Sequence, residues 1–158
     1  MRYKKLHTPV EPKQTAVIPY RIRDNQIEVL LITTRRKKRW IVPKGWIEKK
    51  LSPHTSARQE AREEAGVTGT VSPHPLGCYR HGSARKGLIV QVFLMRVERE
   101  LKSWPEKKER QRRWVSLKQA RKLIKDKGLR SILEEAVPIM QLDDAYEVGD
   151  VLHPALPE

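Results

Sequence analysis

Cysteine and long apolar runs are scarce in this sequence. Of its 158 residues only one is a cysteine, Cys78. A lone cysteine excludes an intrachain disulfide framework and fits a reducing compartment. No uninterrupted apolar stretch of signal-peptide or membrane-span length stands near the N-terminus, so we expect neither secretion nor membrane insertion. We therefore expect a cytoplasmic protein that does not enter a membrane.

Acidic residues are few beside the basic ones. The chain has 33 Lys and Arg against 19 Asp and Glu, which gives a formal net charge of +14 at pH 7. Such an excess favours polyanionic partners, either phosphate-rich small molecules or RNA. The five histidines share no metal-ligand spacing. A chain of this length is expected to form one domain, as a monomer or a homodimer.

Apolar, β-branched stretches predict a sheet. Gln14–Ile22 and Ile27–Thr34 are separated by a polar turn and predict a hairpin. Pro19 predicts an edge or a bulge for the first strand, because proline has no N–H to donate. Leu88–Val97 is long and apolar enough to predict a central strand. Shorter strands are expected at 40–42, 76–80 and 114–115.

Two helices are predicted after the last strand. Ser116 should cap a helix that runs to about Lys127 and ends at Gly128, and a second helix should span about Arg130 to Met140. From Asp143 onward the sequence is acidic and contains no Lys or Arg, so we expect a mobile tail or loose packing against the basic body. The predicted organisation is a lead-in at 1–12, a domain at 13–142 and an acidic tail at 143–158.

The candidate site lies in Pro43–Val67. Ser52 is a good helix N-cap, Pro53 suits the first helical position, and Gly66 supplies a left-handed C-cap. With about 100° between successive residues, three carboxylates share one face of this helix: Glu60, Glu63 and Glu64. An acidic helix face is often only solvated surface. Crowded carboxylates repel one another, however, and hard oxygen ligands suit Mg²⁺ or Mn²⁺.

Basic residues flank this helix in the sequence. Arg35–Arg39 is a run of five cations that must form an exposed loop. The loop is either solubilising surface or a positive rim that neutralises substrate phosphates, which Lys44 would extend. Arg85 and Lys86 place two more cations before the long strand. Trp46 is the one loop tryptophan that could stack on a base.

The spacing of these residues resembles the Nudix box. That motif consists of a glycine, five residues, a glutamate, seven residues and then R-E-U-x-E-E-x-G-U, where U is aliphatic. The fitting positions are Gly45, Glu60, Ala61, Glu63, Glu64, Gly66 and Val67. Leu51 stands where the family has glutamate, and Gln59 stands where it has arginine. We interpret the two neutral residues as the joint loss of a structural ion pair.

The resemblance extends from about Gln14 to Met140 and implies the Nudix fold, an α/β (α+β) domain with a mixed β-sheet sandwiched between helices. Within the Nudix superfamily the chain most resembles the diphosphoinositol polyphosphate phosphohydrolases and their bacterial relatives, through TTRRKKRWIVPKG, GVTGTV, ARKG and WPE followed by RQRRWVSLKQA. The resemblance implies that Glu60 and Glu64 bind metal with a carbonyl at Lys44 or Gly45, and that Glu63 is the general base. The implied phosphate contacts are Thr33, Thr34, Arg35, Lys44, Arg85, Lys86 and Arg110.

The sequence therefore predicts a Mg²⁺-dependent phosphohydrolase, with Mn²⁺ also possible. Its expected substrate contains a diphosphate linkage, as in a diphosphoinositol polyphosphate or a diadenosine polyphosphate. One alternative keeps the chemistry and changes the substrate to an RNA 5′ end or a nucleoside triphosphate. The other alternative is a non-catalytic polyanion-binding module on a degenerate Nudix scaffold, which the substitutions at Leu51 and Gln59 favour and the intact carboxylates oppose.

Overall fold

A mixed β-sheet forms the centre of the molecule. The structure is a computed structural model that describes residues 11–82 and 87–152, with the backbone alone for residues 145–152. Across the sheet run, in this order, β3 (Trp40–Ile41), β2 (Gln26–Thr33), β1 (Gln14–Arg23), β7 (Leu88–Glu100) and β5 (Val67–Val71). Strands β1 and β7 are parallel, and the other neighbours are antiparallel. Three more strands pair with β1, β7 and β2 respectively: β4 (Lys44–Trp46), β6 (Gly77–His81) and β8 (Arg112–Ser116).

Side chains of the central strands alternate between two apolar cores. In β2, Val29 and Leu31 belong to one core, whereas Leu30 and Ile32 belong to the other. This is the period of a strand, in which successive side chains point to opposite faces. Both faces are apolar, so both must be covered.

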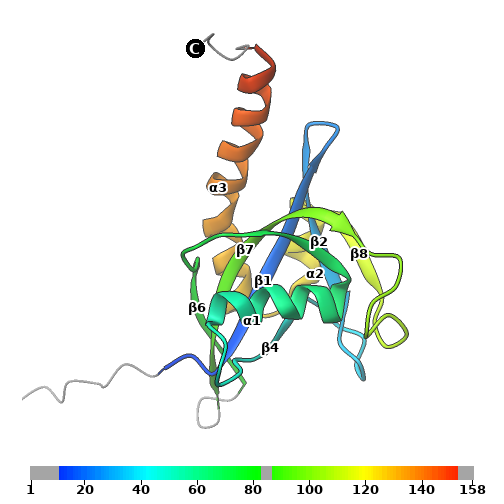
Figure 1. The fold of residues 1–158 in the computed structure, drawn as a ribbon, viewed down its shortest axis with the longest axis vertical. Coiled ribbons are helices and arrows are strands. Elements are labelled where there is room, and N and C mark those ends of the chain that lie inside the picture. The colour runs from blue at the N-terminus through cyan, green and yellow to red at the C-terminus, as the bar shows by residue number, and fades with distance from the viewer. Residues whose placement is uncertain (1–10, 83–86, 153–158) are drawn as a thin grey trace, which may run out of the picture.

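Helices cover both faces of the sheet (Figure 1). On one face lie α1 (Pro53–Glu60) and the π-helical turn η1 (Ala61–Ala65), and on the other lie α2 (Leu117–Leu123) and α3 (Lys127–Leu152). The predicted sandwich of a mixed sheet between helices is thereby confirmed. The C-terminal part of α3 extends past the sheet. None of the helices in the described part of the chain is long and apolar enough to cross a membrane.

The prediction that Pro19 marks an edge or a bulge is wrong. Strand β1 lies between β2 and β7, and its pairing with β7 is continuous from Gln14 to Tyr20. The N–H of Val17 donates to the carbonyl of Pro43, 3.0 Å away. Because N–H groups alternate in direction along a strand, the nitrogen of Pro19 points to the same side. There, the β4 ladder has ended at Ala16 and the β2 ladder begins at Tyr20, so no ladder hydrogen bond is lost.

The boundary between the last two helices also differs from the prediction. Helix α2 ends at Leu123, and Ile124 is extended with φ −75° and ψ 113°. Asp126 begins α3 as an N-cap, since its carboxylate accepts the N–H of Leu129 at 3.1 Å. Gly128 therefore lies inside α3 and does not end α2.

Helix α3 also continues through the segment predicted as a tail. It runs to Leu152 and contains Pro138. Asp143 accepts hydrogen bonds from the Tyr20 hydroxyl at 2.6 Å and from Arg96 at 2.7 Å. The acidic segment thus begins inside the helix, where Asp143 contacts the sheet.

Candidate active site

Helix α1 and the turn η1 together carry Glu60, Glu63 and Glu64 and are called the carboxylate helix below. This helix has the predicted ends, but its pitch changes along its length, which was not predicted. The hydroxyl of Ser52 accepts the N–H of Thr55 at 3.1 Å, and Gly66 is left-handed with φ 63° and ψ 37°. Between them the α-helix becomes a π turn at Ala61. Turns of this kind are frequent at functional sites, and this one carries Glu63 and Glu64.

Small residues bring this helix close to the sheet. Three alanines, Ala57, Ala61 and Ala65, are fully buried in one core. At the start of α1, the hydroxyl of Thr15 in β1 donates to the carbonyl of Pro53 at 3.1 Å. The helix is thus fixed to the sheet at its beginning and along its length.

Glu60 lies against the backbone of Gly45. A Cβ atom at Gly45 would be 2.8 Å from Oε2 of Glu60 and closer still to Oε1. Only glycine leaves room for this carboxylate. Burial raises the pKa of Glu60 to about 7, and the negative charges of Glu63 and Glu106 add to the shift.

Glu64 is buried between a backbone donor and a cation. Only 6% of the residue is exposed. Its Oε2 accepts the N–H of Lys44 and its Oε1 accepts Nη2 of Arg110, both at 3.1 Å. Burial raises the pKa of Glu64 to about 8; Arg110 opposes this shift and Glu60 adds to it.

Glu63, the predicted general base, is held by Gln59. The side-chain amide of Gln59 donates to Oε1 of Glu63 at 2.8 Å. This contact was not foreseen from the sequence. That Gln59 and Leu51 replace a lost ion pair stays a hypothesis.

Glu106 is a fourth carboxylate at the site, which sequence reasoning missed. It lies in the segment between β7 and β8, and its N–H donates to the carbonyl of Glu63 at 3.0 Å. Its side chain pairs with Arg35 and Arg110 and is 14% exposed. The only available signal was its place in the WPE stretch, two residues after Trp104, whose ring packs on Gly66.

Most of the predicted phosphate contacts that the structure describes already make hydrogen bonds or ion pairs within the protein. The hydroxyl of Thr33 accepts the N–H of Gln111 at 2.9 Å, and the hydroxyl of Thr34 accepts the N–H of Arg39 at 3.0 Å. Arg35 pairs with Glu106 and Glu109, and the Arg110 side chain is 9% exposed. Arg85 and Lys86 lie outside the described residues.

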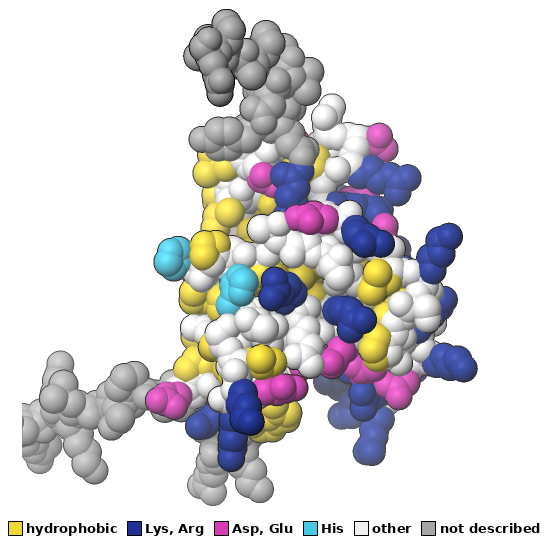
Figure 2. Space-filling model, in the orientation of Figure 1, with side chains coloured by type: hydrophobic (Ala, Val, Ile, Leu, Met, Phe, Trp, Pro, Cys, Tyr) yellow, Lys and Arg dark blue, Asp and Glu magenta, His cyan; other side chains and the backbone are white. Residues whose placement is uncertain are grey.

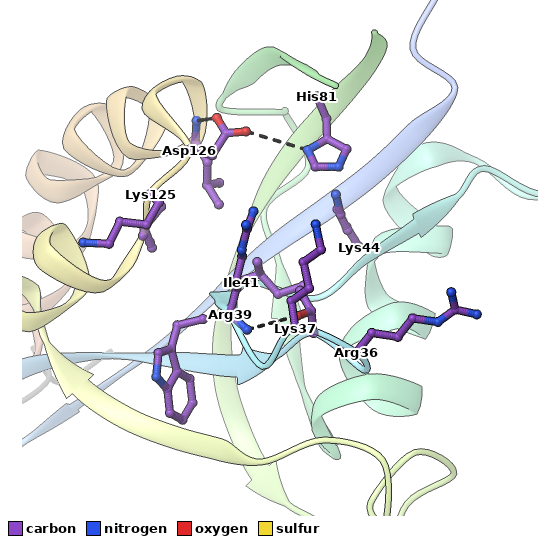
Figure 3. Close-up of a pocket in the computed structure, with 12 residues that line it drawn as sticks. Arg36, Lys37, Arg39, Ile41, Lys44, His81, Lys125 and Asp126 are labelled. Atoms are coloured by element: carbon purple, nitrogen blue, oxygen red, sulfur yellow. Dashed lines mark hydrogen bonds and ion pairs between the residues drawn. The ribbon is translucent and has the colours of Figure 1, made fainter. Parts of the chain in front are cut away.

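A basic cavity of about 500 Å³ opens beside the site. It lies between the loop after β2, the end of β6 and the turn between α2 and α3. Its charged and polar lining comprises Thr34, Arg36, Lys37, Arg39, Lys44, His81, Lys125 and Asp126. Figure 3 shows Lys37, Arg39 and Lys44 pointing toward His81 and Asp126, while Arg36 points away. His81 and Asp126 approach to 3.7 Å.

Lys44 connects this cavity to the carboxylate helix. Its backbone N–H binds Glu64 while its side chain lines the cavity. Burial lowers the pKa of Lys44, although the charges of Asp126 and Glu64 oppose the shift. Figure 2 shows basic side chains spread over the visible face, with an acidic group among them below the right-hand end of α1. Residues of the basic loop after β2 line the cavity together with Lys44, which links it to Glu64; that these cations neutralise substrate phosphates stays a prediction.

The donor set suits a hard divalent cation. Within residues 11–82 and 87–144, no three His, Cys, Asp or Glu side chains converge closely enough to hold a metal ion. Burial raises the pKa values of Glu60 and Glu64, and the negative charges of neighbouring carboxylates add to both shifts; a bound cation would favour the charged forms. Carboxylate oxygens near the Gly45 backbone are the ligands that Mg²⁺ and Mn²⁺ prefer. The residues fit such an ion if Glu64 gives up one of its two hydrogen bonds, to the Lys44 N–H or to Arg110, and binds the ion instead.

Comparison with known proteins identifies the family. Residues 12–136 match the family model described as the NUDIX domain. The match covers most of the chain, which therefore belongs to the Nudix family of hydrolases, enzymes that act on phosphoanhydrides. Nudix hydrolases generally need a divalent metal.

Several relatives resemble the chain over most of its length. It is 35% identical to Nudix hydrolase 4 of Arabidopsis thaliana over 143 residues, 84% of this chain and 69% of that protein. It is 33% identical to diphosphoinositol polyphosphate phosphohydrolase 3-alpha of Mus musculus, over 71% of this chain and 68% of that protein. It spans only 62% of Nudix hydrolase 12, mitochondrial, of Arabidopsis thaliana, at 33% identity over 74% of this chain.

Solved structures show the same fold. The crystal structure of C. elegans Ap4A hydrolase superposes with a TM-score of 0.69, covering 83% of this chain and 99% of that chain. The two sequences are 20% identical, so this likeness concerns the fold alone.

Proposed function

We propose that this protein is a Mg²⁺-dependent phosphohydrolase that cleaves a phosphoanhydride linkage in a polyphosphorylated small molecule. A diphosphoinositol polyphosphate or a diadenosine polyphosphate would be such a substrate. One observation carries the proposal: Lys44 binds the buried Glu64 through its backbone while its side chain enters the basic cavity. Carboxylates for a metal and cations for phosphates are therefore adjacent. The mouse relative and the nematode structure are named for these two substrates.

The roles of the residues follow from their positions. Glu60 and Glu64 would hold the cation, with the Gly45 backbone beside them. When bound, a divalent cation polarises the phosphoanhydride and acidifies the attacking water. Glu63, oriented by Gln59, would accept the proton of that water.

The cavity would bind the rest of the substrate. Phosphoryl transfer depends mainly on positioning and on neutralising charge. Lys37, Arg39 and Lys44 point into one space in Figure 3, where they would pair with phosphate oxygens that the metal does not reach. We also propose a cytoplasmic location, in keeping with the single cysteine.

A second candidate substrate is an RNA 5′ end or a nucleoside triphosphate. Trp46 favours it, because this side chain follows Gly45 directly and is 60% exposed. An exposed indole beside phosphate-binding groups can stack on a base.

A substrate panel tests the proposal. Diphosphoinositol polyphosphates, dinucleoside polyphosphates, nucleotides and 5′-triphosphate RNA would be assayed with Mg²⁺ and with Mn²⁺. Glu63→Gln should lower turnover by about 10²- to 10⁴-fold, the usual contribution of a general base, without changing the melting temperature. Glu135→Gln, the same change on an exposed residue of α3, should leave turnover unaltered. Weak metal binding together with no hydrolysis of any diphosphate would favour the non-catalytic binding module instead.

A further inference from the structure

The guanidinium of Arg110 is nearly buried among acceptors. Its Nη2 donates to Oε1 of Glu64 at 3.1 Å and lies 3.3 Å from Oε1 of Glu106. Its Nη1 donates to the carbonyl of Thr33 at 3.1 Å, and its Nε donates to Glu106 at 3.3 Å. All three nitrogens are thus in use. The family resemblance implied that Arg110 contacts a substrate phosphate. In this arrangement, however, its nitrogens are already bonded to the protein.

The partners of Arg110 form a balanced group of charges. Arg35 and Arg110 share the Oε1 atom of Glu106, and Arg110 alone bridges to Glu64. The Arg110 and Glu64 side chains are 9% and 8% exposed. Burial disfavours the charged form of Glu64 and raises its pKa, and Arg110 is the cation that opposes this shift when no metal is bound.

The same carboxylate is a proposed metal ligand. A divalent cation on Oε1 of Glu64 would lie close to Nη2 of Arg110, and two cations that close repel one another. Because the guanidinium is planar and rigid, Nη2 leaves Glu64 only when the whole group moves, and the contacts of Nε with Glu106 and of Nη1 with the Thr33 carbonyl must adjust with it.

We propose that Arg110 is an internal counter-ion of Glu64 that competes with the divalent cation. A bound divalent cation would displace Nη2 from Glu64 and free its N–H groups to donate to a phosphate oxygen. Arg110 therefore lowers the metal affinity of the unliganded protein and becomes a phosphate donor only after the metal has bound. This inference rests on the proposed function, since it assumes that Glu64 binds metal.

Metal affinity without substrate tests the inference. The full chain would be titrated with Mn²⁺ and the free ion measured by electron paramagnetic resonance. Arg110→Met removes the charge at similar length, and Mn²⁺ should bind about tenfold more tightly because a nearby unit charge is gone. Arg121→Met is the matched control, since it removes the same charge from α2, on the other face of the sheet, where Arg121 pairs with Glu134. Its Mn²⁺ affinity should stay within about twofold of wild type.

The direction of the change in Mn²⁺ affinity shows whether Arg110 competes with the metal for Glu64 or only holds Glu64 in position. If folded Arg110→Met binds Mn²⁺ no more tightly than wild type, Arg110 only positions Glu64 and the inference is overturned. If Arg110→Met does not fold, Arg110→Gln is measured instead; it can still donate to Glu106, and the same gain is expected. A wild-type protein that neither binds Mn²⁺ nor hydrolyses any diphosphate would refute the proposed function. Mn²⁺ binding by wild type without a gain in the variant would refute the inference alone.

Discussion

At the scale of single residues, Gly45 matters for the side chain it lacks. Its missing Cβ is the space that the Glu60 carboxylate occupies. Gln59 is a comparable case, because this neutral residue stands at a position where the family has arginine and donates to Glu63. Both residues act by deciding where a carboxylate lies.

Gly45→Ala should therefore damage the site and spare the fold. The new methyl group must push the Glu60 carboxylate away, and displacing a reacting group by about 1 Å can cost about 100-fold in rate. We expect a loss of that order in Mg²⁺-dependent turnover, with weaker Mn²⁺ binding. Gly77→Ala is the control, because its Cβ would meet no atom closer than 3.8 Å. Equal turnover in both variants would show that Glu60 does not need this space.

At the scale of elements, the end of the carboxylate helix is completed by the segment between β7 and β8. The carbonyl of Gly66 accepts the N–H of Leu101 at 2.8 Å, and Arg112 donates to the same carbonyl at 3.1 Å. The last carbonyls of a helix lack partners within it, so this segment satisfies them. It also brings Glu106 and Arg110 to the site.

Gly66→Ala should loosen this junction. The position has φ 63°, and an added Cβ would lie 2.7 Å from Cγ of Trp104. Left-handed backbone alone costs an L-residue about 1–2 kcal/mol, and the contact with the ring adds to that. Urea denaturation should show a loss of about 2 kcal/mol or more in the free energy of unfolding, together with reduced activity. A loss below about 0.5 kcal/mol, typical of an ordinary surface change, would contradict this account.

Local signals predicted the elements that depend on neighbours in sequence. The Ser52 cap, the Gly66 cap and the buried strand β2 were foreseen because each depends on a few adjacent residues. Contacts between distant residues were not foreseen. Asp143 joins α3 to Tyr20, 123 positions earlier, and no local pattern records that pairing. Glu106 likewise reaches the carbonyl of Glu63 from the segment between β7 and β8.

At the scale of the whole molecule, part of the basic excess lines one cavity. The net charge of +14 attracts any polyanion. The cavity adds direction to this attraction, because among the described residues five cationic side chains line it beside one carboxylate: Arg36, Lys37, Arg39, Lys44 and Lys125, with Asp126. Substrate affinity should therefore depend on where the cationic residues lie and not only on the net charge.

Two charge reversals of equal size test that claim. Lys37→Glu places a negative charge at the cavity, just after β2, whereas Lys118→Glu places it beside Gln26, where β2 starts. We expect Lys37→Glu to raise KM for a polyphosphate about tenfold at low salt, and Lys118→Glu to leave it within about twofold, because distant exposed charges are screened beyond about 10 Å at 0.1 M salt. The difference should shrink as salt rises. Equal KM values in the two variants at low salt would mean that net charge alone draws the substrate in, and the cavity would then lose its assigned role.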